Sequence, residues 1–181
     1  VVLGGGFTAV DAARSALRLG AKEVYIAYRR TRDEMPATGD EIAEAEAEGV
    51  KIMYLVSPVE IVAEGGKVSA IRMDTQTLGE ADASGRRRPE GVSGAVFTLP
   101  CDCVISAVGQ KPDAAAAAEL VCDKKGMIAV DRDTMTADNF VFAGGDAVEV
   151  RNIISAIADG RRAAFSIDST LTGGNPTVEN V

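Results

Sequence analysis

The sequence predicts an α/β fold in which helices flank a central parallel sheet and an antiparallel β segment forms a crossover within it. Three observations support this prediction. An apolar run at residues 1–3 is followed by a glycine-rich turn, a helical stretch and a second apolar run at 24–27. Residues 60–73 alternate like a β-hairpin around two glycines. A later apolar run, residues 140–143, also ends in two glycines.

The first glycine turn, GGGFTA at residues 4–9, fits the pattern G-x-G-x-x-A. Gly4 allows a tight turn, Gly6 leaves no Cβ between the backbone and a pyrophosphate, and Ala9 permits close helix–strand packing. The N–H groups that open the next helix would face the anion, and the helix dipole would attract it. Strand, turn, helix and strand in this order predict a dinucleotide-binding βαβ unit. A purely structural glycine turn is the alternative.

The end of the second strand indicates which dinucleotide is bound. NAD sites usually carry an acid about 20 residues after the glycines, where it holds the ribose 2′-hydroxyl. This chain has Tyr28, Arg29 and Arg30 there, with Arg32 close by. A guanidinium fork binds a 2′-phosphate, which a carboxylate would repel. The pair therefore predicts NADP, and a solvated basic turn is the alternative.

Composition sets the broad class. The 181 residues are 46% hydrophobic and 25% charged, which is typical of one globular domain or two small ones. The net charge of −8 argues against nucleic acid and anionic membranes as partners. Because the sequence shows neither a membrane-length apolar run nor a signal peptide, a cytoplasmic location is expected.

Residues suited to metal or nucleophilic chemistry are few. Cys101, Cys103 and Cys122 form no C-x-x-C pair, which disfavours a redox disulfide, an iron–sulfur site or a zinc site. The first two alternate along a predicted strand and are interpreted as structural thiols. The absence of histidine excludes imidazole chemistry. The chain opens inside a strand without Met, so we expect a piece of a longer polypeptide.

The middle of the chain continues the alternation of helix and strand. Residues 31–37 are predicted to form a loop or short turn because Pro36 bars a helix. A helix is expected over 40–48, ended by Gly49, and a strand over 50–56.

Residues 78–94 are polar and predict a long loop that carries Arg86, Arg87 and Arg88. These arginines either grip a phosphate or acidic partner, or form a solvated tip.

Strands are expected at 95–99 and 101–108, the second central and buried on both faces. It ends at Gly109, where a cofactor or another backbone can approach closely. A helix over 114–120, a strand over 126–130 and a turn over 131–134 complete this part.

The second glycine pair leads directly into an acid. Asp146 follows Gly144 and Gly145, where a carboxylate is well placed to accept hydrogen bonds from sugar or ribitol hydroxyls. The alternative is that Asp146 caps the next helix, predicted over 153–168. The tail from Gly173 is expected to fray.

Five segments carry a resemblance to one family: GGGFTAVDAARSALRLGAKEVYIAYRRTRDEMPA, LGEADASGRRRPEG, VISAVGQKPD, VFAGGDAV and AIADGRRAAFSID. Together they resemble the small-subunit family of NADPH-dependent glutamate synthase, within the pyridine nucleotide-disulfide oxidoreductase superfamily. The resemblance covers nearly the whole chain and implies a Rossmann-like FAD/NAD(P)-binding fold. It divides the chain into an NADPH-binding domain, residues 1–108, and a C-terminal segment of an FAD-binding domain, residues 109–181.

The resemblance also implies a set of cofactor-binding residues and no catalytic side chain. The NADPH pyrophosphate would be lined by the glycine turn and the start of its helix, and the 2′-phosphate by the arginine pair. The flavin would meet the ends of two strands and the start of the last helix. In order, these residues are Gly4, Gly5, Gly6, Phe7 and Thr8; Arg29 and Arg30; and Gly109, Gly145, Asp146, Ile153 and Ile154.

The implied function is hydride transfer from NADPH to FAD, with electrons passing through iron–sulfur clusters to a catalytic partner subunit. The alternative is a non-catalytic nucleotide-binding or electron-transfer scaffold module within a larger complex. A dehydrogenase with its own organic substrate is disfavoured, since no His, Tyr-x-x-x-Lys or acid pair offers proton transfer. Apolar surface after Gly109 would pack back on the NADPH domain or pair with a second copy through open sheet edges.

Overall fold

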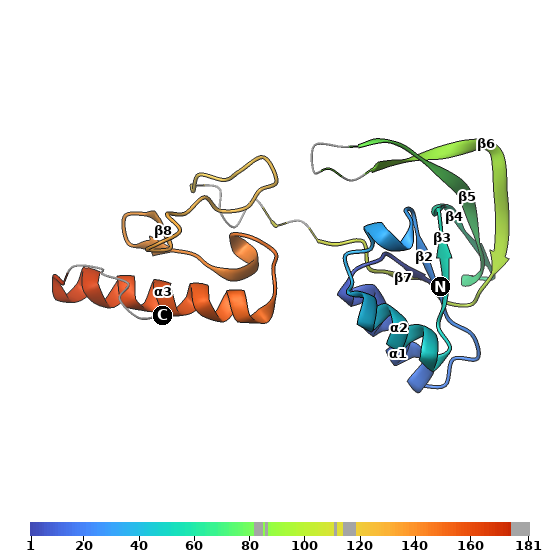
Figure 1. The fold of residues 1–181 in the computed structure, drawn as a ribbon, viewed down its shortest axis with the longest axis horizontal. Coiled ribbons are helices and arrows are strands. Elements are labelled where there is room, and N and C mark those ends of the chain that lie inside the picture. Colours follow the sequence, from blue (N-terminus) through green and yellow to red (C-terminus); the bar gives the residue numbers. More distant parts are fainter. Residues whose placement is uncertain (82–84, 86, 111, 114–118, 175–181) are drawn as a thin grey trace. The chain divides into compact units, whose positions relative to one another are not determined.

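The computed structural model describes residues 1–81, 85, 87–110, 112–113 and 119–174. The chain divides into two compact units, Val1–Gly109 and Gln110–Val181, which are described separately (Figure 1).

The first unit is built around a parallel sheet with the strand order β3-β2-β1-β7. Strand β1 pairs with β2 on one side and with β7 on the other, and β2 also pairs with β3. Both β1 and β2 are short and buried, as expected for apolar strands covered on two faces. The bounds of the four are β1 Val2–Leu3, β2 Tyr25–Tyr28, β3 Lys51–Tyr54 and β7 Ile105–Ser106.

Two helices, α1 (Phe7–Arg18) and α2 (Gly39–Glu48), pack together against one face of this sheet. Side chains alternate along a strand, so Val2 and Ile26 face the helices, where both are almost fully buried. Helix α2 ends at Gly49, whose φ of 105° is left-handed, and the predicted helix with its glycine stop is confirmed. Arg14 and Arg18 of α1 both bind Glu48 of α2, and their hydrogen bonds lower the pKa of Glu48 to about 2.

The opposite face of the parallel sheet is covered by an antiparallel sheet, β4 (Val56–Glu64), β5 (Lys67–Ala81) and β6 (Arg87–Pro100) (Figure 1). Leu3 and Ala27 pack there against Ile71 and Met73. The predicted hairpin is confirmed, and the φ values of 59° at Gly65 and 78° at Gly66 fit its tight turn.

Two predictions for the first unit are wrong. Much of 78–94 is not loop, because β5 and β6 continue their ladder through pairs such as Gln76 with Gly91 and Thr77 with Glu90. Backbone pairing needs no apolar side chains, so a solvent-facing ribbon has the composition of a loop. The run 101–108 is not a central strand: only Ile105–Ser106 pairs, at the sheet edge, and both residues are exposed.

The predicted strand over 50–56 is divided in two. Leu55 has a left-handed φ of 56°, which breaks the extended backbone between β3 and β4. Its N–H donates to the carbonyl of Arg30 and its carbonyl accepts from the N–H of Gln76. One residue therefore carries the chain from the parallel sheet into the antiparallel one.

The second unit contains the hairpin β8 (Thr136–Asp138) and β9 (Val141–Phe142), the short helix η3 (Gly145–Ala147) and the long helix α3 (Ile153–Thr172). The predicted final helix is confirmed and extends a little further. The strand predicted over 126–130 is wrong, since Ile128 makes only an isolated bridge to Cys122. Most of the helix predicted over 114–120, and the tail from 175, lie outside the described residues.

None of the helices in the described ranges combines the length and apolar character needed to cross a bilayer.

Candidate nucleotide-binding site

The first glycine turn is shaped by the packing of the protein itself at two of its three glycines. Gly4 has a φ of +138°, and a Cβ there would overlap the carbonyl oxygen of Ala107, which follows β7. A Cβ on Gly5 would lie 2.5 Å from Cδ2 of the Tyr28 ring. Side chains are therefore excluded at both positions whether or not a ligand binds.

Gly6 differs, because its neighbourhood is open. It is the N-cap of α1 with a φ of −93°, and the nearest atom to a Cβ there would be Pro36 Cβ at 3.9 Å. Within the described residues, no side chain caps α1 and no acid lies in its first turn. The next two residues, Phe7 and Thr8, are exposed, and their N–H groups have no partner within the helix. This helix start can receive an anion.

The turn after β2 folds over the glycine turn. Its short helix η1 (Arg32–Glu34) begins with a reciprocal cap, in which Thr31 and Glu34 bond each other's backbone N–H groups. The Tyr28 hydroxyl donates to the Glu34 carbonyl at 2.6 Å, and the Ala37 N–H donates to the Gly5 carbonyl at 3.1 Å. Hydrogen bonds from the hydroxyl and then the backbone N–H of Thr31, followed by the charges of Arg87 and Arg30, lower the pKa of Glu34.

The arginines after β2 lie in three different environments. Arg29 is exposed. Arg30 is only 4% exposed, and its Nε donates to the carbonyl of Arg87 at 2.7 Å. Arg32 binds both carboxylate oxygens of Glu46 on α2, at 2.7 and 2.8 Å. In this conformation, Arg29 is the member of the predicted pair that faces solvent.

A cleft of about 490 Å³ opens beside this turn. One wall is the turn itself, and the other carries Gly85 and Arg87, the first residue of β6. Its lining residues are Asp33, Glu34, Met35, Pro36, Gly85 and Arg87. The sequence predicts a loop over 78–94 and leaves a phosphate-binding role for its arginines open, but it does not predict that this segment lies beside the turn after β2.

The residues predicted to meet a flavin belong to both units and are described within each unit separately. Gly109 ends the first unit, exposed and with a φ of +92°. In the second unit Asp146 is exposed in η3, directly after Gly145. At the start of α3, Ile153 and Ile154 are 79% and 78% exposed.

Helix α3 is capped by Asn152, whose side chain accepts the Ser155 N–H at 2.9 Å. The alternative role considered for Asp146, as the cap of this helix, is therefore wrong.

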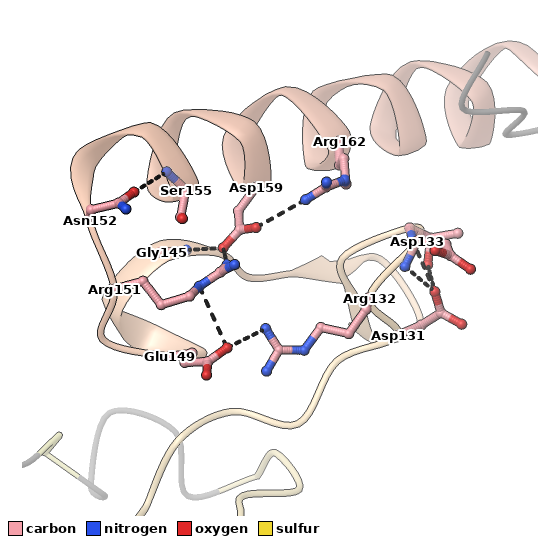
Figure 2. A network of polar contacts seen from close by, with 11 residues as sticks. Asp131, Arg132, Asp133, Gly145, Glu149, Arg151, Asn152, Ser155, Asp159 and Arg162 are labelled. Atoms are coloured by element: carbon pink, nitrogen blue, oxygen red, sulfur yellow. Dashed lines mark hydrogen bonds and ion pairs between the residues drawn. The ribbon is translucent and has the colours of Figure 1, made fainter. Parts of the chain in front are cut away.

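Asp159 is the buried acid that sequence reasoning missed. Figure 2 shows it pointing from α3 toward Gly145 and Arg151. Its carboxylate, 1% exposed, accepts from the Gly145 N–H at 3.1 Å and from Arg151 Nη2 at 2.5 Å. Arg162 donates to its other oxygen at 3.3 Å. Burial raises the pKa of Asp159, but the bonds from Arg151 and Gly145 outweigh this effect and leave it below its ordinary value.

The network continues to the surface through Glu149. Its carboxylate lies 3.5 Å from Arg151 Nε and 3.2 Å from Arg132 Nη1 (Figure 2). The available signal in the sequence was an acid on an alanine-rich helix, with Arg151 before it and Arg161 and Arg162 after it.

A parallel βαβ unit with a glycine turn and an uncapped helix start defines a nucleotide-binding α/β protein of the Rossmann type. The chain belongs to the pyridine nucleotide-disulphide oxidoreductase family, whose model matches residues 1–160.

Named relatives support the narrower resemblance. The chain is 49% identical to the NADP(+)-dependent formate dehydrogenase subunit beta of Moorella thermoacetica, over 99% of this chain and 26% of that protein. It is 42% identical to the glutamate synthase [NADPH] small chain of Escherichia coli, over 94% of this chain and 38% of that protein. The predicted relationship to the glutamate synthase family is confirmed, and the chain spans well under half of either relative.

Among solved structures, thioredoxin reductase from Lactococcus lactis matches with a TM-score of 0.77 at 24% identity, over 95% of this chain and 52% of that one. This likeness shows the fold, and it confirms the predicted Rossmann-like α/β fold class.

Proposed function

We propose that this chain is the NADPH-handling part of a flavoprotein oxidoreductase, in which hydride passes from NADPH to FAD and electrons then pass to partner subunits. The observation that carries the proposal is the uncapped start of α1, where Gly6 leaves the approach open and Phe7 and Thr8 are exposed. Such a helix start binds a diphosphate through its N–H groups and its dipole. Both named relatives are NADP-linked by name.

The proposed assignment of residues follows the prediction. Residues 1–108 hold NADPH, with the pyrophosphate on Gly4 to Thr8 and the 2′-phosphate selected by Arg29 and Arg30. Of this pair, Arg29 is exposed and suited to direct contact. A guanidinium favours the phosphorylated ribose because it gives a charged, forked hydrogen bond that a plain hydroxyl cannot match.

Residues 109–181 belong to an FAD-binding domain in this proposal. Asp146 is an exposed acceptor suited to a ribitol hydroxyl, and Ile153 and Ile154 offer apolar surface for the ring. The Gly145 N–H is already bonded to Asp159. In this proposal the second unit therefore contacts FAD through side chains and not through the amide of Gly145. When both cofactors are bound, NADPH supplies the hydride and FAD accepts it.

The chain's own residues bind and orient in this mechanism. None acts as acid, base or nucleophile, because hydride transfer between two cofactors requires their alignment rather than a protonating side chain. The same proposal includes iron–sulfur and catalytic subunits as electron acceptors. It also includes pairing of two copies of the chain along a sheet edge such as β7.

Calorimetric titration with NADPH and NADH, after a scan for flavin absorbance, tests the proposal. We expect NADPH to bind more tightly than NADH. Arg29→Ala should weaken NADPH binding by roughly tenfold or more, which corresponds to the loss of one charged hydrogen bond. NADH binding should stay within about twofold. Equal weakening of both nucleotides would contradict the assignment of Arg29. A colourless chain that binds NADPH would favour the alternative, a nucleotide-binding scaffold module.

A further inference from the structure

The cleft between η1 and the β5–β6 hairpin lies where the adenosine end of a dinucleotide belongs. Nucleotides bind outside the carboxyl ends of the strands in open α/β sheets, and the turn that lines the cleft directly follows β2. Pro36 belongs both to the cleft wall and to the surroundings of Gly6. A ligand with its diphosphate at Gly6 can therefore extend past Pro36 into the cleft.

The chemistry of the walls suits a base and ribose rather than a bare polyanion. Met35 and Pro36 offer apolar surface, and Arg87 faces them with a cationic, planar group that can stack on an aromatic ring. Asp33 and Glu34 also line the cleft, and two carboxylates oppose a polyphosphate. A single 2′-phosphate, which these carboxylates would also repel, needs a nearby cation, and Arg87 supplies one. It is one of the three arginines for which the sequence left a phosphate-binding role open.

Arg30 connects this hairpin to the end of β2. A buried guanidinium is costly unless it is hydrogen-bonded, and Arg30 Nε donates to the backbone carbonyl of Arg87 at 2.7 Å. The Arg87 side chain in turn donates to the carbonyls of Leu78 and Gly79 on β5, at 2.5 and 3.2 Å. The contact from Arg30 therefore fixes the first residue of β6, the residue whose side chain lines the cleft.

We propose that this cleft binds the adenosine 2′-phosphate end of NADP, with Arg87 as a direct contact and Arg30 as a positioning residue that holds Arg87 in place. The inference rests on the proposed function, because it requires a dinucleotide at the glycine turn. It adds a determinant of cofactor choice far from the βαβ unit in sequence. It also gives the buried Arg30 an effect on NADP preference that does not require contact with the phosphate.

The test is calorimetry on the full chain with NADPH, NADH, 2′,5′-ADP and 5′-ADP. Arg87→Ala should weaken NADPH and 2′,5′-ADP by roughly tenfold, and NADH and 5′-ADP by no more than about twofold. The matched control is Arg72→Ala, an exposed arginine of β5 that pairs with Glu60, and it should leave all four affinities unchanged. Unchanged 2′,5′-ADP affinity in Arg87→Ala would overturn the inference.

Arg30→Met tests the positioning role, since it keeps a long side chain and removes the donor. This variant should lower the ratio of NADPH to NADH affinity, and it should also speed hydrogen exchange of the backbone amides at 87–100. Faster exchange with an unchanged ratio would overturn the positioning role. If Arg30→Met fails to fold, the exposed Arg87→Ala still decides whether the cleft is used. A wild-type chain that binds neither NADPH nor NADH would instead refute the proposed function, and the inference with it.

Discussion

The two units each place two or more glycines after a strand and a helix soon after them, but the two helix starts differ. Among the residues that the structure describes, no side chain caps α1 at its N-cap Gly6, whereas the N-cap of α3, Asn152, accepts the Ser155 N–H. In the second unit the Gly145 N–H is bonded to the buried Asp159. The same local pattern thus gives an open helix start in one unit and, in the other, a turn whose Gly145 N–H is bonded within the protein.

The glycines themselves are required for different reasons. A Cβ on Gly144 would lie 2.9 Å from the Cβ of Asp159, and one on Gly145 would lie 3.4 Å from the Cβ of Ala156. The close approach of α3 explains the glycine at position 144, and the left-handed φ of +60° explains the glycine at position 145. At Gly6 the nearest atom would be 3.9 Å away, so packing alone does not require glycine there. A glycine that packing does not require is the better indicator of a ligand.

The largest expected effect is at the closed turn. Asp159→Ala removes the partner of Arg151 and of the Gly145 N–H, and breaking a buried ion pair costs about 3–5 kcal/mol. Hydrogen exchange in α3 and residues 141–150 should therefore speed by about a hundredfold or more. Asp168→Ala, an exposed acid on the same helix, is the control and should change little. Similar exchange in the two variants would show that the network does not hold the turn.

A smaller effect should separate the glycines of the open turn. Gly4→Ala combines a strained positive φ with overlap on the Ala107 carbonyl, and should lower the free energy of unfolding by about 2–4 kcal/mol. Gly6→Ala should cost about 1 kcal/mol or less, because it meets open space at an ordinary φ. Urea unfolding followed by circular dichroism measures both.

The two variants should also differ in binding. In NADPH titration, Gly6→Ala should weaken affinity at least about tenfold, since its methyl group stands where the diphosphate approaches. Unchanged affinity in Gly6→Ala would remove the diphosphate from this turn.

The smallest expected effect is the pH dependence of the closed turn. The folded pKa of Asp159 lies below its unfolded value of about 3.9. Its stabilising contribution is therefore complete above about pH 5 and is lost as pH falls through the folded pKa. Asp123 and Asp131, whose pKa values are also lowered, add to the same trend. Thermal melts from pH 6 to 3 should show a shallower decline in Asp159→Asn than in wild type, and parallel curves would contradict this.

Much of the fold could be predicted because the signals are local. The glycine turn, the helix stopped by Gly49 and the hairpin at Gly65 and Gly66 each follow from conformations that glycine adopts readily. The ribbon of β5 and β6 could not be predicted from the sequence, because pairs such as Thr77 with Glu90 are made by the backbone and leave no apolar pattern.

The candidate site divides in the same way. Arg29 and Arg30 are neighbours in one basic run, yet Arg29 is exposed and Arg30 is buried. Arg30 is held in its buried position by a hydrogen bond to the carbonyl of Arg87, which lies far along the chain. Asp159 likewise acquires its role from Gly145 and Arg151, which lie outside its helix. Contacts of this kind depend on tertiary structure, so residue spacing alone does not reveal them.

The contact of Gly4 with Ala107 has a mechanical consequence. Ala107 is bonded to β1 through its N–H, at 2.8 Å from the Leu3 carbonyl, and the first unit ends shortly afterwards at Gly109. The tether to the second unit is thus anchored directly against the turn proposed to cradle the diphosphate. Because a Cβ at Gly4 would overlap the Ala107 carbonyl, a displacement of residues 107–109 toward the turn would have to shift the backbone of Gly4.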